Sequence, residues 1–513
     1  MPFAVTTTPL AETAADVLAV GLFEGSRPEG ALAALDRALD GEIAHLLETG
    51  DVTGKSGQTA VIYGRGRIAA TRLLVVGLGK GADFTVDRVR QAAARAAQRA
   101  RDLGAAHLAT TLFHPARGAG GRPAGLAEAA QATVEGILLG LHRLDRFKTN
   151  AEDREKAEKT ARLAQVTLVA GEGEAPGEVS AGASVGEVVA GAVRFARELI
   201  ATPSNEATPS RMAQYARDLA AEGGFTATIL GLEELTALGA GGIVAVNRGS
   251  HEFEPARFGV LEYDGTGGAG APVVLVGKGI TFDTGGISLK PADGMDRMKY
   301  DKAGSVAVLA TFKAVAALKL PVRLVGLCPW TENTPSGSAY RPGDVVRFLN
   351  GKTAEIVNTD AEGRVVLADA LAYASRYRPA AVIDLATLTG AIKVALGTEA
   401  AGLMSNDPAL AARVKAAAEA SGERVWELPL FDEYRELIKS DIADIKNSGG
   451  RDAGSITAAL FLKEFVDYPW VHLDIAGVGW ADKDRPYVPK GAVGFGVRLL
   501  VQFLRDWARD GGR

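Results

Sequence analysis

Two carboxylates and a guanidinium lie within seven residues of this chain, at positions 358–364, which read NTDAEGR. The preceding residues 352–357 (KTAEIV) alternate in the manner of a strand. In extended backbone, positions i and i+2 project to one side, so Asp360 and Glu362 are predicted to converge on one metal ion. The apolar residues that follow at three-and-four spacing predict a helix with Arg364 near its start. Taken alone, the heptad 358–364 is explained equally well in two ways. It could be a metal site, or it could be the start of a helix whose acidic residues interact favourably with the helix dipole.

A second group of charged residues lies upstream, in the glycine-rich segment 276–290 (VGKGITFDTGGISLK) and in the tetrapeptide 298–301 (MKYD). The group consists of Lys278, Asp283, Lys290 and Asp301. Each of them alone is more often a surface or turn residue than part of a site. Their joint occurrence with the heptad favours a metal centre. Carboxylates without histidine suit hard or borderline divalent ions.

No histidine accompanies these carboxylates in the sequence. The six histidines are His45, His107, His114, His142, His251 and His472. His472 lies within an apolar strand and is interpreted as a core residue. A general base drawn from histidine is therefore not expected.

The elements that position the charged residues predict an α/β catalytic domain. Strands are expected at 272–276, 322–327, 381–386 and 470–475, and the segments between them include helices, such as 303–318 and 456–466. This alternation predicts a mostly parallel sheet flanked by helices. Ligands of such sheets bind at the carboxyl ends of the strands. Polar and glycine-rich residues follow each predicted strand, which places the candidate site at that edge.

A smaller α/β domain is predicted for residues 1–170, with strands at 60–63 and 72–77 and a helix over 86–103. Residues 171–184 contain few large apolar side chains and much glycine and glutamate, which is typical of a linker. The catalytic domain is then expected over 185–513, beginning with a helix that ends at Ala201.

The composition is that of an ordinary globular protein. Of 513 residues, 47% are hydrophobic and 23% charged, which excludes a mainly disordered chain. A net charge of -5 gives no global attraction to nucleic acid or anionic membrane. The single cysteine, Cys328, is predicted to be a buried thiol, and neither a signal peptide nor a membrane span is expected. These features predict a cytoplasmic protein.

Taken together, these segments resemble the cytosolic leucyl aminopeptidase family of dinuclear metallo-aminopeptidases. The resemblance runs from about residue 196 to 500, and NTDAEGR with the upstream K-x4-D-x6-K is its most specific part. Further matching segments are ENTPSGSAYRPGD, DLATLTGA, GRDAGSITAALFLKEF and HLDIAGVGW.

The resemblance implies a role for each charged residue. Asp283 and Glu362 would bridge two ions, Zn or Mn. Lys278 and Asp301 would complete the more tightly held ion, and Asp360 the more exchangeable one. Lys290 and Arg364 would be catalytic without binding metal, and bicarbonate on the arginine would accept the proton from a metal-activated water.

The resemblance also implies a substrate and an assembly. The substrates would be peptides, from which N-terminal, preferably apolar and leucine-like residues are hydrolysed. Met298, Thr387 and Gly390 would line the side-chain pocket, although packing of the edge explains them equally well. The family forms homohexamers, which is the expected oligomeric state.

Two positions depart from the family pattern. Lys302 follows Asp301 where relatives commonly carry methionine, so an extra ammonium lies near a predicted ligand. It either points into solvent or alters ion affinity or substrate preference. Val493 occupies a place often held by threonine. Neither change removes a predicted ligand.

Two alternatives to a simple aminopeptidase remain. Five arginines on the 86–103 helix suggest an additional DNA-binding role of the N-terminal domain, against the acidic net charge. A dinuclear metal phosphatase would also use carboxylates and basic residues, but a lysine ligand fits it poorly.

Overall fold

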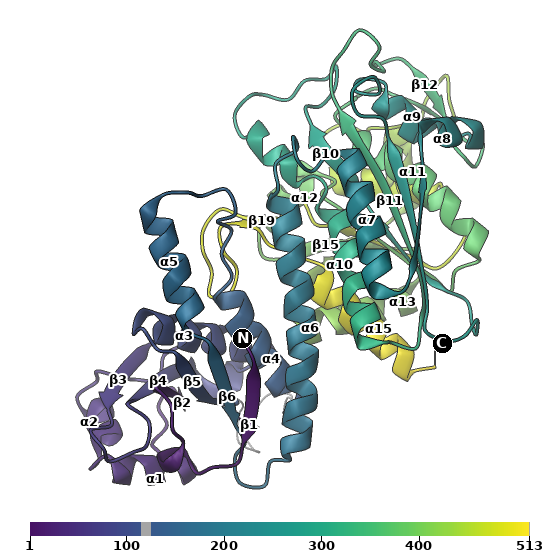
Figure 1. Cartoon of the computed structure of the whole chain (residues 1–513). Helices are drawn as coiled ribbons and strands as arrows, with labels where there is room; N and C mark the ends of the chain where they lie inside the picture. The colour runs from purple at the N-terminus through teal and green to yellow at the C-terminus, as the bar shows by residue number, and fades with distance from the viewer. Residues whose placement is uncertain (114–124, 512–513) are drawn as a thin grey trace. The chain divides into compact units, whose positions relative to one another are not determined.

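The computed structural model describes residues 1–113 and 125–511, which form two compact units (Figure 1). The first unit comprises Met1–Gly191 with Lys483–Pro489, and the second comprises Ala192–Asp482 with Lys490–Arg513. The sequence predicts residues 483–489 in the catalytic domain. They belong instead to the first unit, where Gln98 Nε2 donates a hydrogen bond of 2.8 Å to the carbonyl of Pro486.

The predicted linker 171–184 is mostly helical, because helix α6 spans Pro176–Ala201. Its glycines serve close packing rather than chain flexibility. A Cβ on Gly182 would lie 2.0 Å from the carbonyl oxygen of Ala127, and one on Gly186 would lie 2.7 Å from that of Gln131. Both carbonyls belong to helix α4 (Leu126–Gly140). Glycine in this segment thus lets two helices approach each other.

The first unit is built on a six-stranded sheet with the order β1-β6-β5-β2-β4-β3, parallel except for the β3–β4 pair. Strand β2 reads VLAVGLF and is almost wholly buried, as expected for a strand with parallel neighbours on both sides. The strands are β1 Phe3–Thr6, β2 Val17–Phe23, β3 Thr59–Tyr63, β4 Arg72–Gly79, β5 His107–Thr111 and β6 Gln165–Val169. The other helices are α1 Gly30–Ala38, α2 Glu42–Glu48, α3 Val86–Asp102 and α5 Ala151–Arg162, with short 3-10 turns at Leu10–Glu12 and Gly81–Asp83.

Helix α3 carries the five arginines of the suggested DNA-binding surface, but they do not form one solvated face. Arg90 is 2% exposed, and its Nε donates a hydrogen bond of 2.5 Å to Glu135 Oε2, which is also buried. Arg88 and Arg95 donate to Ser56 and to the carbonyl of Gly57. The helix therefore uses part of its positive charge for internal packing.

Replacing Arg90 by methionine is expected to lower the free energy of unfolding by about 3–5 kcal/mol, because it leaves the Glu135 carboxylate buried without its cation. Guanidinium denaturation followed by far-UV circular dichroism would measure the loss. The same substitution at exposed Arg99 on the same helix is the control and should cost less than about 0.5 kcal/mol. Equal denaturation midpoints for the two variants would contradict a structural role for Arg90.

The second unit is built on a nine-stranded sheet with the order β16-β15-β18-β14-β9-β11-β8-β7, and β10 pairs with β11. Its central pairs are parallel, while β15–β18, β11–β8 and β7–β8 are antiparallel. The strands are β7 Thr226–Leu230, β8 Arg257–Asp264, β9 Val273–Gly277, β10 Gly279–Asp283, β11 Arg323–Asn333, β14 Ala381–Ala386, β15 Ala401–Ser405, β16 Val425–Glu427 and β18 Trp470–Asp474. The mostly parallel sheet predicted from the sequence is confirmed.

Helices and short strands complete the second unit. The helices are α7 Pro209–Gly223, α8 Leu232–Leu238, α9 Gly241–Asn247, α10 Ala303–Leu318, α11 Glu362–Ala374, α12 Gly390–Leu396, α13 Pro408–Ser421, α14 Gly454–Lys463 and α15 Val497–Arg509. The 3-10 segments are η3 Met295–Tyr300, Ser375–Tyr377 and Asp432–Ile438. Small sheets join β12 Val345–Arg347, β13 Thr353–Glu355 and β17 Ile445–Lys446, and separately β19 Trp480–Ala481 and β20 Gly491–Ala492.

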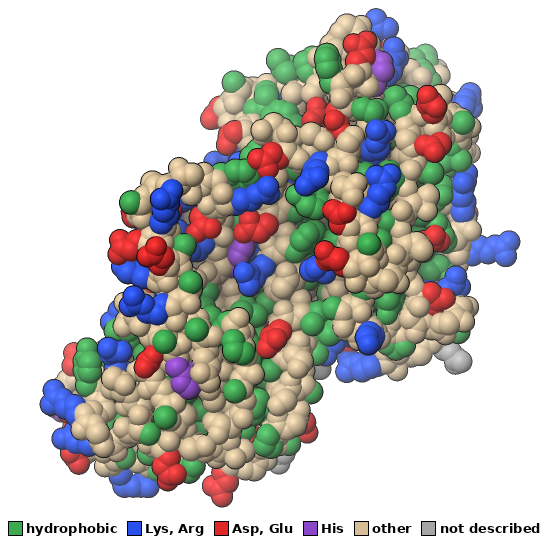
Figure 2. Space-filling view, viewed as in Figure 1, with side chains coloured by type: hydrophobic (Ala, Val, Ile, Leu, Met, Phe, Trp, Pro, Cys, Tyr) green, Lys and Arg blue, Asp and Glu red, His purple; other side chains and the backbone are tan. Residues whose placement is uncertain are grey.

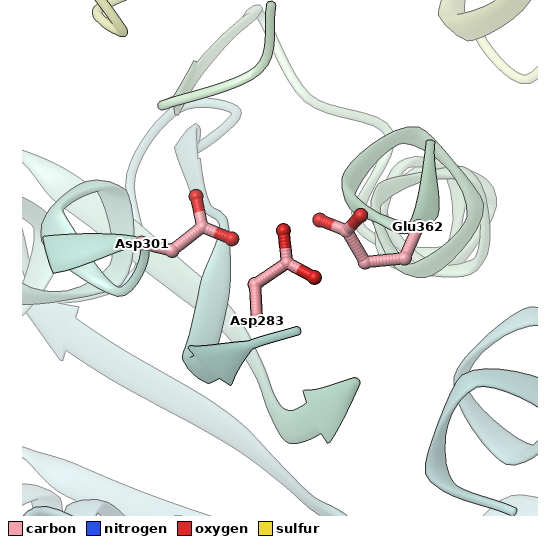
Figure 3. A group of neighbouring side chains, drawn as sticks. All are labelled: Asp283, Asp301 and Glu362. Atoms are coloured by element: carbon pink, nitrogen blue, oxygen red, sulfur yellow. The ribbon is translucent and has the colours of Figure 1, made fainter. Parts of the chain in front are cut away.

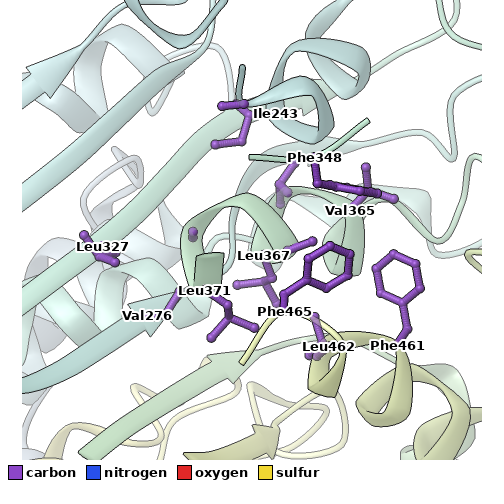
Figure 4. Packing of buried hydrophobic residues seen from close by; sticks show 14 of the residues in the cluster. Ile243, Val276, Leu327, Phe348, Val365, Leu367, Leu371, Phe461, Leu462 and Phe465 are labelled. Atoms are coloured by element: carbon purple, nitrogen blue, oxygen red, sulfur yellow. The ribbon is translucent and has the colours of Figure 1, made fainter. Parts of the chain in front are cut away.

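Helices cover both faces of the large sheet. On β9, Val274 and Val276 belong to a core cluster with residues of α11 and α14 (Figure 4). Because side chains alternate along a strand, the neighbouring residues of β9 face the other side, where α10 packs against the sheet. Phe348 joins the cluster, with its ring centroid 4.8 Å from that of Phe465. This two-sided burial fixes the strand ends that carry the candidate site.

The surface and the apolar helices give no simple membrane signal. On the face shown in Figure 2, acidic and basic side chains are interspersed. Among the described residues, α6 alone is long and apolar enough to cross a membrane by length and composition, and 50% of its apolar window is buried inside the protein. Cys328 is fully buried, as predicted.

Candidate metal centre

Three buried carboxylates from separate parts of the second unit point toward one another (Figure 3). Asp283 is the last residue of β10, Asp301 follows η3, and Glu362 is the first residue of α11. Their ligand atoms lie within 4.8 Å of one another. Glu362 is 1% exposed and Asp301 6%. The sequence predicted all three as ligands, and the fold brings them together.

Asp360 lies apart from this group of three. Strand β13 ends at Glu355, residues 358–361 form a turn, and Glu362 is already helical. The prediction that Asp360 and Glu362 share one side of an extended backbone is therefore wrong. The Asp360 side chain is 34% exposed and pairs with Lys290.

The turn is held by Thr359, which the sequence did not single out. Its hydroxyl donates to the carbonyl of Gly285 at 2.6 Å, and its own carbonyl accepts hydrogen bonds from Asn333 Nδ2 and the Tyr340 hydroxyl, both at 2.9 Å. Asn333 Nδ2 also lies 2.8 Å from Asp283 Oδ1. One asparagine at the end of β11 thus ties a predicted ligand to the turn that carries Asp360. Asn333 lies at the predicted edge of the sheet, and this position was the only sequence feature that pointed to a role for it in the site.

Lys278 lies between β9 and β10 among three oxygen neighbours. Its Nζ is 2.8 Å from Asp301 Oδ2 and 2.8 Å from Glu362 Oε1, and it donates to the carbonyl of Thr387 at 3.0 Å. Gly363 leaves space for this side chain, because a Cβ there would lie 2.7 Å from Nζ. The glycine of the heptad is thereby explained.

Lys290 joins two further carboxylates. Its Nζ lies 2.7 Å from Asp283 Oδ2 and also pairs with Asp360 Oδ1. Its side chain is 19% exposed, so it can reach both the carboxylates and solvent. Burial lowers the pKa of Lys290, but the negative charges of Asp283, Glu362 and Asp360 raise it more, so the amine is held as an ammonium.

The site is short of positive charge. Its four carboxylates face two ammonium groups, which leaves an excess of two negative charges among these six side chains. Burial, followed by the charge of Asp283, raises the pKa of Glu362 to about 8. Burial also raises the pKa of Asp301 to about 6, against the opposite effect of Lys278. A cation bound beside these carboxylates would favour their ionised forms and so act against both shifts.

Two buried oxygens have unused bonding capacity. Among the described residues, Glu362 Oε2 is buried and accepts no hydrogen bond, and buried Asp301 Oδ2 is paired with Lys278 Nζ, 2.8 Å away, and with no further donor. Buried carboxylate oxygens are costly unless they are hydrogen-bonded or coordinate a metal. The donor set, its charge and these two oxygens therefore fit divalent cations.

Arg364 is buried in the first turns of α11, close to the position predicted. Its NH1 donates to the carbonyl of Asn447 at 3.0 Å, whereas its buried Nε has no hydrogen-bond partner among residues 1–113 and 125–511. Asn447 Nδ2 donates to the carbonyl of Asn358 at 2.7 Å, so this asparagine joins the arginine to the heptad turn. Burial lowers the pKa of Arg364 to about 10, against the effect of Glu362, so it stays charged at neutral pH.

Lys302 does not point into solvent. It is fully buried, and its Nζ donates to the carbonyls of Thr202 at 2.9 Å and Lys299 at 2.6 Å. Burial lowers the pKa of Lys302 to about 7, and its amine braces the segment that ends in Asp301 instead of extending toward water. The other departure, Val493, is half-buried, and its carbonyl accepts a hydrogen bond from Arg197 Nε at 2.9 Å, which any residue type could supply.

The predicted pocket residues lie in different environments. Met298 is half-buried in η3, Thr387 is 7% exposed after β14, and Gly390 is exposed at the start of α12. His472 is buried, with Nδ1 2.6 Å from Asp384 Oδ1, as expected for a core histidine. His114 lies outside the described residues.

Comparisons with family models match most of the chain. Residues 194–501 match the catalytic domain of the cytosol aminopeptidase family, and residues 19–151 match its N-terminal domain. A probable cytosol aminopeptidase of Geotalea uraniireducens is 49% identical over 472 residues, covering 92% of each chain. One of Roseiflexus castenholzii is 48% identical over 507 residues, covering 97% of each chain.

Solved structures resemble the chain over nearly its whole length. A tomato leucine aminopeptidase mutant superimposes with a TM-score of 0.86 at 33% identity, covering 98% of this chain and 96% of that one. The bottromycin maturation enzyme BotP in complex with Mn superimposes with a TM-score of 0.83 at 38% identity, covering 96% of this chain and all of that one.

Proposed function

Because the chain belongs to the cytosol aminopeptidase family and is therefore an aminopeptidase, we propose that it removes apolar, leucine-like N-terminal residues with the help of two divalent cations. The observation that carries the cation dependence is the meeting of three buried carboxylates within 4.8 Å, one of which, Glu362, keeps a buried oxygen without a hydrogen bond among the described residues. A Mn complex of a similar enzyme supports Mn, and Zn is the alternative. A leucine aminopeptidase among the similar structures supports the leucine-like preference.

We assign the predicted ligands as Lys278, Asp283, Asp301, Asp360 and Glu362. Two cations held there would supply Lewis-acid activation of a water molecule for attack on the first peptide bond. Lys278 must lose a proton to act as a ligand, since an ammonium has no free electron pair.

Lys290 and Arg364 would act on the substrate side of this group. The ammonium of Lys290 would polarise the scissile carbonyl and stabilise the oxyanion that develops on it. Arg364 offers a planar pair of donors suited to an oxyanion such as bicarbonate, which could accept the proton of the attacking water and pass it to the leaving amine. The buried Nε of Arg364, which has no hydrogen-bond partner in the part of the chain that the structure describes, supports this second role.

Substrate choice, location and assembly complete the proposal. A neutral α-amine of the peptide would be recognised beside the cations, which restricts cleavage to the first bond. Met298, Thr387 and Gly390 remain the predicted pocket residues. The names of the relatives support a cytoplasmic location, and the homohexamer remains a prediction that light scattering would check.

Removal of metal tests the proposal. We expect chelation to abolish release of N-terminal residues from a peptide library, and separate reconstitution with Mn, Zn or Co to restore it, with leucine-like residues released fastest. Leucine p-nitroanilide and a phosphate ester should be assayed in parallel. Full activity after complete metal removal would exclude cation dependence, and turnover of the phosphate ester alone would favour a phosphatase.

A further inference from the structure

Thr387 contacts two predicted metal ligands that come from different segments. Its hydroxyl donates a hydrogen bond of 2.6 Å to Asp301 Oδ1, and its carbonyl accepts one of 3.0 Å from Lys278 Nζ. Thr387 follows β14 directly and is 7% exposed. Another predicted pocket residue, Met298, contacts Asp301 through the main chain alone, since its carbonyl accepts a hydrogen bond of 3.3 Å from the Asp301 N–H.

The hydroxyl of Thr387 determines which oxygen of Asp301 is available. With Oδ1 engaged by the hydroxyl, the remaining oxygen, Oδ2, is buried and faces the other predicted ligand, Lys278, whose Nζ lies 2.8 Å away. A charge-assisted hydrogen bond of this length fixes the rotation of the carboxylate. Oδ2 is thereby left for a cation.

The carbonyl of Thr387 orients Lys278 in a similar way. The Thr387 carbonyl accepts one N–H of Lys278 at 3.0 Å, and this fixed acceptor restricts the rotation of the amine. The backbone of Lys278 is also fixed, because its N–H donates to the carbonyl of Leu385 at 3.0 Å and its carbonyl accepts from Ser305 at 2.8 Å. Side chain and main chain of Lys278 are thus both held by residues at the end of β14 and the start of α10.

The segment that carries Thr387 is itself rigidly held by Asp474, at the end of β18. Asp474 is fully buried and accepts hydrogen bonds from the N–H groups of Leu388 at 3.2 Å and Thr389 at 3.4 Å, and from the hydroxyl of Thr389 at 2.6 Å. Thr389 in turn caps α12 by accepting from Ile392 N at 3.1 Å. These contacts hold the two residues that follow Thr387.

We propose that Thr387 is a positioning residue of the metal centre, whose hydroxyl and carbonyl set the orientations of Asp301 and Lys278. The inference rests on the proposed cation-dependent function. A positioning role differs from a role in the substrate pocket, because the Thr387 hydroxyl is hydrogen-bonded to Asp301. The Thr387 methyl group packs near Gly479, since a Cβ built on Gly479 would lie 3.1 Å from that methyl. Partners of metal ligands commonly contribute about 10–100-fold to metal affinity.

The test compares Thr387→Val, Thr387→Ala and Thr387→Ser with the wild type. Mn affinity is measured on the full chain by chelator competition, and kcat and KM are measured at saturating Mn. We expect the valine and alanine variants to bind at least one ion roughly 10–100-fold more weakly, and the serine variant, which keeps the hydroxyl, to stay within about threefold of the wild type. KM at saturating Mn distinguishes the two roles, because a positioning role lowers ion affinity whereas a pocket role raises KM with ion affinity retained.

Three results would overturn the inference. The first is wild-type Mn affinity in both variants that lack the hydroxyl. The second is an equal loss in the serine variant, which would indicate a packing role of the methyl. The third is a rise in KM without a change in ion affinity, which would indicate a pocket role. Failure of the proposed function would be distinguished from failure of this inference, because the wild type itself would then bind no Mn. Should the valine variant not fold, the alanine and serine pair decides.

Discussion

Glu362→Gln is expected to abolish peptide hydrolysis, with kcat/KM falling by roughly a thousandfold or more. The substitution keeps the shape of a side chain that is 1% exposed but removes the negative charge from Oε2, the buried oxygen without a hydrogen bond. Partners of metal ligands are worth about 10–100-fold in affinity, so a ligand itself should be worth more than about 100-fold. Ion binding and activity should therefore fall together.

Isothermal titration with Mn and a peptide assay would measure both effects of Glu362→Gln. The matched control is Glu427→Gln on strand β16, where the carboxylate pairs only with Lys415 at the surface among the described contacts. It should bind ions and hydrolyse peptides like the wild type. Wild-type activity in Glu362→Gln would remove the basis of the proposed metal centre.

Lys290→Ala is expected to lower the rate of peptide hydrolysis without weakening ion binding. We expect kcat to fall by about 100- to 1000-fold, the usual effect of removing one donor to a developing oxyanion. The ions should be retained, because Lys290 competes with cations for Asp283 and Asp360 instead of binding metal itself. Loss of that competing ammonium should leave Mn affinity unchanged or slightly higher.

Metal analysis of the dialysed protein and steady-state kinetics at saturating Mn would check Lys290→Ala. Lys439→Ala, at an exposed lysine paired with Glu436, is the control for loss of an ammonium and should behave like the wild type. A variant that loses its ions, or one that keeps its full rate, would contradict the assigned role.

The sequence pattern predicted the scaffold well wherever long elements are buried on both sides. Strand β14 and helix α10 begin and end at the residues expected, because continuous apolar runs between polar ends leave little choice of boundary. The three carboxylates that meet were also predicted. Of the three, Asp283 is placed by β10, which pairs in parallel with β11 beyond the part of β11 that pairs with β9.

Local conformation around the site was less predictable. The residues before the heptad alternate like a longer strand, but β13 has only three residues and a turn held by Thr359 follows it. The contacts of Thr359 come from Gly285 and Asn333, which are distant in sequence, so no local pattern reports them. Periodicity indicates which face is buried, not which loop supplies a hydrogen bond.

The glycines of α6 and Lys302 lie in environments that their residue types did not indicate, for a related reason. The glycines of α6 resemble linker residues in composition, yet they allow helix α4 to pack closely. Lys302 resembles a surface residue, yet two carbonyl groups bind its amine inside the protein. In both cases the deciding partner is a backbone carbonyl of another segment, and a backbone carbonyl is present in every residue type.

The order of the strands has a consequence for a chain still emerging from the ribosome. Strand β14 lies between β9 and β18, and the loop after β14 is fastened by Asp474. A nascent polypeptide that has been translated only as far as Glu362 already contains every predicted ligand, but it lacks the strands that hold them in place. The predicted ligands can therefore reach the arrangement described here only after residues as far as Asp474 have joined the sheet.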